Sequence, residues 1–117
     1  MEFINLKAQY QAYKSSIDKA MQDVLDSSQF IMGSAVGELE SALAKYSGAK
    51  HAIACSSGTD ALILALMALD VKSGDEVITS PFSFIASVEA IMLLGAKPVF
   101  VDIDEKTYNL SSSKLES

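Results

Sequence analysis

Residues 51–66 read His51-Ala-Ile-Ala-Cys-Ser-Ser-Gly-Thr-Asp-Ala-Leu-Ile-Leu-Ala-Leu66, and this stretch decides the fold. It predicts a short buried strand, a small polar loop and an apolar helix that starts at the loop. Free backbone N–H groups, hydroxyls and the positive end of a helix dipole together favour an anion, most often a phosphate group. An ordinary helix start, capped by Ser57 or Thr59 without any ligand, fits the same residues. The motif is neither a P-loop nor a dinucleotide fingerprint, so this stretch alone leaves both interpretations open.

Alternating helix and strand patterns surround this stretch. The expected elements are helices at 15–27 and between Gly33 and Gly48, a strand at 51–55, a helix at 60–69, a strand at 76–80, a helix at 84–94 and a strand at 97–101. The helix at 60–69 is apolar nearly all round, so we expect it to be buried on both sides. The alternation predicts an α/β fold with a mostly parallel sheet and flanking helices.

The C-terminal residues predict one further element. Residues 110–116 look like the first turn of another helix, capped by Ser111 or Ser112. No apolar stripe follows this cap, so we expect residues 1–117 to be the N-terminal portion of a larger domain, truncated at Ser117.

Length and charge limit the class of protein. With 117 residues the chain forms one domain at most. Its net charge is −6 and it has no stripe of basic residues, so nucleic-acid binding is not expected. No apolar run approaches the roughly 20 residues of a membrane span, and no secretory signal follows Met1, so a cytoplasmic protein is expected. Cys55, the single cysteine, is expected in the buried strand. All nine basic residues are lysines, so any bidentate grip on an anionic substrate must come from later sequence or another subunit.

Three further motifs occur in order around the Ser-Gly-Thr loop: Phe30-Ile-Met-Gly33, Gly74-Asp-Glu-Val-Ile-Thr-Ser-Pro-Phe-Ser-Phe84 and Gly95-Ala-Lys-Pro-Val-Phe-Val-Asp-Ile-Asp104. Together the four motifs resemble the DegT/DnrJ-type nucleotide-sugar aminotransferases, which use pyridoxal 5'-phosphate (PLP). The resemblance runs from about Phe3 to about Leu115 and implies the N-terminal part of the large domain of a fold-type I PLP-dependent transferase. Residues 3–10 and 86–91 look most like the branch acting on UDP-linked N-acetylated keto sugars of the 3-oxo uronate type.

The resemblance implies a set of cofactor-binding residues. Gly58, Thr59 and Asp60 match positions whose backbone N–H groups, with the threonine hydroxyl, hold the PLP phosphate, and Ser57 joins them. Phe84 matches the aromatic residue that stacks on the pyridine ring of PLP. The alternative for Phe84 is that it fills the core.

A second set of residues is implied to lie near the substrate. Phe30, Met32 and Gly33 match a loop beside the active site that contacts the sugar, although a hydrophobic staple for the following helix explains the same residues. Glu89 either meets the substrate or faces solvent.

The remaining polar candidates are interpreted structurally. Asp102 and Asp104 are expected to end a strand and shape a turn rather than bind a metal, and no metal site is predicted. His51 is expected to be structural, because nothing in the sequence places a carboxylate or nucleophile beside it.

The resemblance also implies residues that this chain lacks. The family's Schiff-base lysine and the acidic partner of the pyridinium nitrogen lie beyond the matched region, and none of the nine lysines lies in that lysine's context. We therefore expect no catalytic residue in this chain and no activity from it alone. The implied parent enzyme is a homodimer that transfers an amino group from glutamate to a keto carbon of a UDP-linked sugar for surface polysaccharide synthesis, without nucleic-acid or membrane partners. A stand-alone, non-catalytic phosphate-binding α/β module and a non-functional truncated product remain the alternatives.

The resemblance finally implies a folding problem. In the fold-type I scaffold, strands from later sequence lie between the strand matching 51–55 and the strands matching 76–80 and 97–101. Unpaired strand edges and uncovered apolar helix faces favour association, so the isolated chain is expected to be insoluble, oligomeric or molten.

Overall fold

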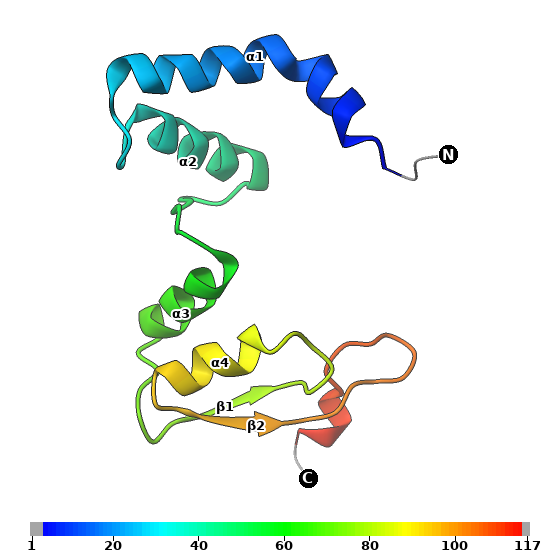
Figure 1. The fold of residues 1–117 in the computed structure, drawn as a ribbon. Helices are drawn as coiled ribbons and strands as arrows, with labels where there is room; N and C mark the ends of the chain where they lie inside the picture. The colour runs from blue at the N-terminus through cyan, green and yellow to red at the C-terminus, as the bar shows by residue number, and fades with distance from the viewer. Residues whose placement is uncertain (1–3, 116–117) are drawn as a thin grey trace. The chain divides into compact units, whose positions relative to one another are not determined.

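The structure is a computed structural model that describes residues 4–115 (Figure 1). Its elements, in order, are α1 (Leu6–Ser27), α2 (Ser34–Ser47), α3 (Gly58–Ala68), β1 (Glu76–Thr79), α4 (Ala86–Leu93), β2 (Lys97–Phe100) and the 3₁₀ turn η1 (Ser112–Lys114). The chain divides into two compact units, residues 1–54 and residues 55–117.

The first unit consists of the helices α1 and α2. The side chain of Asn5 caps α1 by accepting a hydrogen bond from the backbone N–H of Ala8 at 2.9 Å. This cap explains why the helix begins at Leu6 rather than at the predicted Ser15. Gly48 ends α2 with a φ of 72°, as predicted, because a left-handed residue there costs glycine no steric strain. Neither helix has a buried residue.

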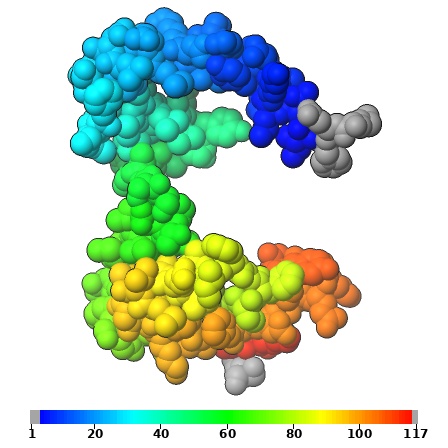
Figure 2. Space-filling view, in the orientation of Figure 1, coloured from blue at the N-terminus to red at the C-terminus, as the bar shows by residue number. Residues whose placement is uncertain are grey.

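The second unit is built on a parallel strand–helix–strand arrangement. Strands β1 and β2 pair in parallel, with Glu76 opposite Lys97 and Thr79 opposite Phe100. Helix α4 connects the two strands and packs against them, and α3 packs against α4 (Figure 1). In the space-filling view α4 (yellow) lies directly against the orange residues of β2 (Figure 2).

The core of the second unit is small. The buried apolar residues of the described part of the chain are Ala90, Ile91, Ala96 and Val101. These residues lie on α4, on β2's flanks and in the turn between them, so the core is the seam between α4 and the strand pair. The parallel pairing confirms the predicted direction of the sheet for these two strands.

The prediction of a strand at 51–55 is wrong for this structure. A strand requires a ladder of backbone hydrogen bonds to a neighbour, and no strand partner for 51–55 is present among residues 4–115. The backbone N–H of Ala54 instead donates to the Glu40 side chain at 2.8 Å. Without a sheet around it Cys55 is exposed, contrary to the expectation that it is buried.

The expected burial of α3 on both sides is also not found. Helix α3 has no buried residue, and Leu62, Leu64 and Met67 are exposed. Only α4 packs extensively on α3 in the described part of the chain, so the remaining apolar faces have no cover there. The exposure agrees with the reasoning behind the predicted association of the chain, which itself stays a prediction.

Candidate functional site

The polar loop before α3 ends in a capped helix start. Ser57 is the N-cap, and its side-chain Oγ accepts a hydrogen bond from the backbone N–H of Asp60 at 3.1 Å. The carbonyl of Ser57 accepts the first helical hydrogen bond, from Ala61, at 3.0 Å. Within the described residues the backbone N–H groups of Gly58 and Thr59 have no hydrogen-bond partner. Two donors at the positive end of the helix dipole are therefore available to an anion.

The packing of the chain leaves room for a side chain at Gly58. A Cβ atom built on Gly58 would meet nothing within 4 Å, whereas one on Gly33 would lie 2.5 Å from the carbonyl oxygen of Gln29. The chain's own packing thus requires a glycine at Gly33 but not at Gly58. Glycine in a helix is about 1 kcal/mol less favourable than alanine, so its presence at Gly58 needs another explanation. Close approach of a ligand to the backbone is such an explanation.

Asp60, unlike Gly58 and Thr59, makes hydrogen bonds within the loop through both its backbone N–H and its side chain. Its backbone N–H is engaged by the Ser57 Oγ atom, and its carboxylate accepts a hydrogen bond from the hydroxyl of Ser56. A carboxylate in the first turn stabilises the helix but repels a bound anion. The available donors are the N–H groups of Gly58 and Thr59 and two hydroxyl groups, those of Ser57 and Thr59.

Phe84 lies in the loop that follows the carboxyl end of β1. Its side chain is 77% exposed, so the alternative that it fills the core is wrong for this structure. Helix α3 precedes β1 in the chain, and α4 connects the carboxyl end of β1 to the amino end of β2. Both helices run opposite to the strands, so their amino ends lie on the side of the strands' carboxyl ends (Figure 1). Ligands of parallel α/β sheets bind on that side. The structure therefore places the α3 loop and Phe84 at the same end of the second unit.

Phe30, Met32 and Gly33 belong to the first unit, in the loop between α1 and α2. They line a hollow of about 340 Å³ together with their neighbours in this loop. A hydrophobic staple would join Met32, just before the N-cap Gly33, to the fourth helical residue, and that residue is Gly37. Because Gly37 has no side chain, the staple is not possible here, and Met32 is 76% exposed.

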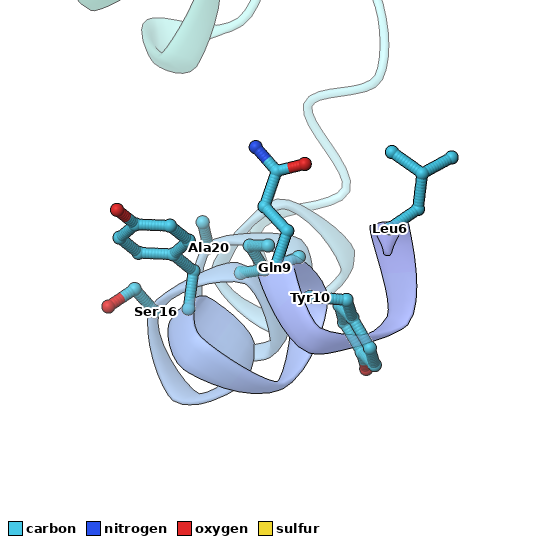
Figure 3. A pocket seen from close by; sticks show the side chains of 7 residues that line it. Leu6, Gln9, Tyr10, Ser16 and Ala20 are labelled. Atoms are coloured by element: carbon cyan, nitrogen blue, oxygen red, sulfur yellow. The ribbon is translucent and has the colours of Figure 1, made fainter. Parts of the chain in front are cut away.

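Other hollows are shallow and local. Glu89 is exposed in the first turn of α4, where it lines a hollow of about 400 Å³ with Met92 and Leu93. A hollow of about 550 Å³ lies over α1, and its side chains all come from that one helix (Figure 3). The exposure of Glu89 is compatible with both alternatives, contact with the substrate or with solvent.

Asp102 and Asp104 shape the loop after β2, as predicted. Asp104 accepts hydrogen bonds from the backbone N–H groups of Thr107 and Lys106 at 2.9 and 3.0 Å, which hold the pKa of its carboxyl below the usual range. Asp102 accepts from the N–H of Ile103 at 2.8 Å and pairs with Lys114, and its pKa is lowered by these contacts in that order. Among residues 4–115 no three His, Cys, Asp or Glu side chains are grouped so that they could hold a metal ion.

The sequence interpretation missed one contact at this end of the second unit. The rings of Phe82 and Tyr108 stack with their centroids 5.9 Å apart and their planes at 24°. The alternating pattern around Phe82 and the turn residues around Tyr108 contain no signal for this pairing.

No helix in the described part of the chain is long and apolar enough to cross a membrane.

Comparisons with known proteins point to one family. The model of the DegT/DnrJ/EryC1/StrS aminotransferase family matches residues 11–117. The UDP-2-acetamido-2-deoxy-3-oxo-D-glucuronate aminotransferase of Pseudomonas aeruginosa is 52% identical over 117 residues, which are 100% of this chain and 33% of that protein.

Solved structures agree with this match. The crystal structure of a DegT/DnrJ/EryC1/StrS aminotransferase from Brucella abortus is similar with a TM-score of 0.91 and 40% identity, over 99% of this chain and 31% of that one. NtdA from Bacillus subtilis, solved with the cofactor PMP bound, is similar with a TM-score of 0.85 and 34% identity, over 90% of this chain and 24% of its own. The chain thus spans a third or less of the length of these relatives.

Proposed function

The chain belongs to the DegT/DnrJ/EryC1/StrS aminotransferase family, and on that premise we propose that it supplies the phosphate and ring side of a PLP site in a nucleotide-sugar aminotransferase. The observation that carries the proposal is the amino end of α3. Gly58 and Thr59 offer two N–H groups there without a partner among the described residues, and a Cβ atom on Gly58 would meet nothing within 4 Å. The geometry fits a phosphate monoester, which is held elsewhere by the same combination of donors and helix dipole.

Each residue of the site has a separate role in this proposal. The N–H groups of Gly58 and Thr59 bind the phosphate oxygens, and the hydroxyls of Ser57 and Thr59 donate further hydrogen bonds. Asp60 holds the loop in place through the cap rather than contacting the anion. The exposed ring of Phe84 covers one face of the pyridine ring and excludes water from it.

The reaction follows from the cofactor and from the relatives. When bound, PLP supplies the electron sink that amino transfer requires. The substrate of the P. aeruginosa relative, as its name states, is a UDP-linked N-acetylated 3-oxo uronate. We propose a UDP-linked keto sugar as acceptor and glutamate as donor, in a cytoplasmic homodimer that serves polysaccharide synthesis. Phe30, Met32, Gly33 and Glu89 are the candidate sugar contacts, and catalytic groups are assigned to none of the residues of this chain.

The test is amino transfer by the complete protein that contains these residues. It is incubated with PLP, ¹⁵N-glutamate and UDP-linked 3-keto N-acetylated sugars, and incorporation of ¹⁵N into the nucleotide sugar is followed by mass spectrometry. Transfer to a UDP-linked keto sugar supports the proposal. PLP binding without transfer to any keto sugar favours the stand-alone phosphate-binding module. The absence of PLP binding contradicts the proposed aminotransferase site.

A further inference from the structure

The two loops at the carboxyl ends of β1 and β2 contact each other through one aromatic pair. Phe82 lies in the loop after β1, and Tyr108 lies in the loop after β2. Their stacked rings remain 65% exposed each, so burial in a core does not explain why they meet. The near-parallel planes and the centroid distance of 5.9 Å are those of an attractive offset stack.

The backbone of Tyr108 is held in an unfavourable conformation. Its φ of 59° lies in the left-handed region, which is uncommon for a residue with a bulky side chain. Asp104 fixes this conformation from both sides: its carbonyl accepts from the N–H of Tyr108 at 2.9 Å, and its own N–H donates to the carbonyl of Asn109 at 2.9 Å. Strained residues persist where the surroundings over-determine them. The Asp104 turn therefore presents the Tyr108 ring in a fixed direction.

The loop that carries Phe82 has few other restraints. The N–H of Phe82 donates to the Ser80 side chain at 3.1 Å, and the hydroxyls of Ser83 and Ser87 lie 3.3 Å apart. Phe84 follows two residues after Phe82: its carbonyl accepts from the N–H of Ser87 at 3.2 Å, whereas its exposed ring is held by no core. The direction of the Phe84 ring thus depends on how firmly the loop itself is held.

We propose that Tyr108 is a positioning residue: by stacking on Phe82 it holds the 80–85 loop so that the ring of Phe84 is presented to the cofactor ring. The loop-holding part of this inference stands on the contacts alone. The part that concerns the cofactor rests on the proposed function.

Amide hydrogen exchange in the complete protein that contains these residues, purified without cofactor, tests the loop-holding part. Tyr108→Ala removes the ring, and Tyr108→Asn removes it while tolerating the left-handed backbone. Both variants are expected to accelerate exchange of the Phe82 and Ser87 amides, which donate to the Ser80 side chain and to the Phe84 carbonyl, by about 2- to 10-fold, the range expected for one aromatic pair. Tyr108→Phe keeps the stack and should exchange like the wild type, as should the Ile91 amide in all variants. Unchanged exchange of the Phe82 and Ser87 amides in Tyr108→Asn would overturn the proposal.

A double-mutant cycle tests whether Tyr108 acts through Phe84. Tyr108→Asn is expected to weaken PLP binding several-fold, to leave the affinity for inorganic phosphate unchanged, and to have no further effect in a Phe84→Ala background. Additive losses of PLP affinity would refute the link to Phe84, because a general structural effect does not depend on that ring. If the wild type binds neither PLP nor phosphate, the proposed function is wrong, and the exchange experiment still decides whether Tyr108 holds the loop.

Discussion

Replacing Gly58 with valine should separate ligand binding from folding. A Cβ atom at Gly58 would meet no other part of the described chain within 4 Å, and we expect a valine side chain there to obstruct the approach of an anion to the Gly58 and Thr59 N–H groups. A hydrogen bond to a charged group contributes about 1.5–3 kcal/mol. Loss of both bonds therefore weakens phosphate and PLP binding by about 3–6 kcal/mol, or roughly 10²- to 10⁴-fold.

The stability of the variant should barely change. Valine and glycine differ by less than about 0.5 kcal/mol in helix propensity, and Gly58→Val creates no clash with the chain. Gly37→Val in α2 is the matched control, because a Cβ atom there also meets nothing within 4 Å. It should leave both affinities unchanged.

Calorimetric titration with inorganic phosphate and with PLP measures the affinities, and thermal unfolding measures the stability. The reasoning is refuted if Gly58→Val binds PLP within twofold of the wild type while it remains folded. It is equally refuted if Gly37→Val loses as much affinity as Gly58→Val, since the loss would then not come from the anion site.

Three further outcomes are expected. Ile91 is 3% exposed, so Ile91→Ala should lower the free energy of unfolding of the second unit by about 2–5 kcal/mol, measured by denaturant unfolding. Met92 is 62% exposed, so Met92→Ala should lower it by well below about 1 kcal/mol. Equal effects of the two substitutions would contradict the assigned core. On acidification, the Asp104 turn should persist through pH 5 and loosen below about pH 4. The pKa of the Asp104 carboxyl is lower in the folded than in the unfolded chain, so the charged carboxylate stabilises the fold at pH values above the unfolded pKa of about 3.9. This stabilisation is lost as the pH falls through the pKa of the folded state. Loss of the Tyr108–Phe82 ring-current shifts near neutral pH would contradict this. Residues 1–117 alone should self-associate at micromolar concentration through the exposed faces of α3 and α4, and a single monomer boundary in sedimentation velocity would disprove it.

Local signals made the helix boundaries predictable. Gly48 and Gly95 directly follow two of the predicted helices, and both adopt left-handed φ values, of 72° and 74°. Asn5 is an equally clear capping residue for α1, but the helix was predicted to begin only at residue 15. The start of α1 is therefore also encoded locally, in the capping side chain of Asn5.

Long-range contacts could not be predicted in the same way. The apolar run at 51–55 has the composition of a strand, but whether it pairs depends on residues far along the chain. The Phe82–Tyr108 stack joins two loops that share no sequence pattern.

The alternatives for the α3 loop turned out to be compatible. Ser57 caps the helix through the N–H of Asp60, and this leaves the N–H groups of Gly58 and Thr59 unpartnered. A capped helix start and an anion site use different donors, which the sequence alone could not separate.

The parallel pair of β1 and β2 also bears on the order of folding. Residues 76–100 contain both strands and the helix that connects them, so their contacts close over a short length of chain. Short loops cost little closure entropy and form early. The strand–helix–strand segment is thus placed to form early in folding, and pulse-labelled hydrogen exchange should find β1, α4 and β2 protected together.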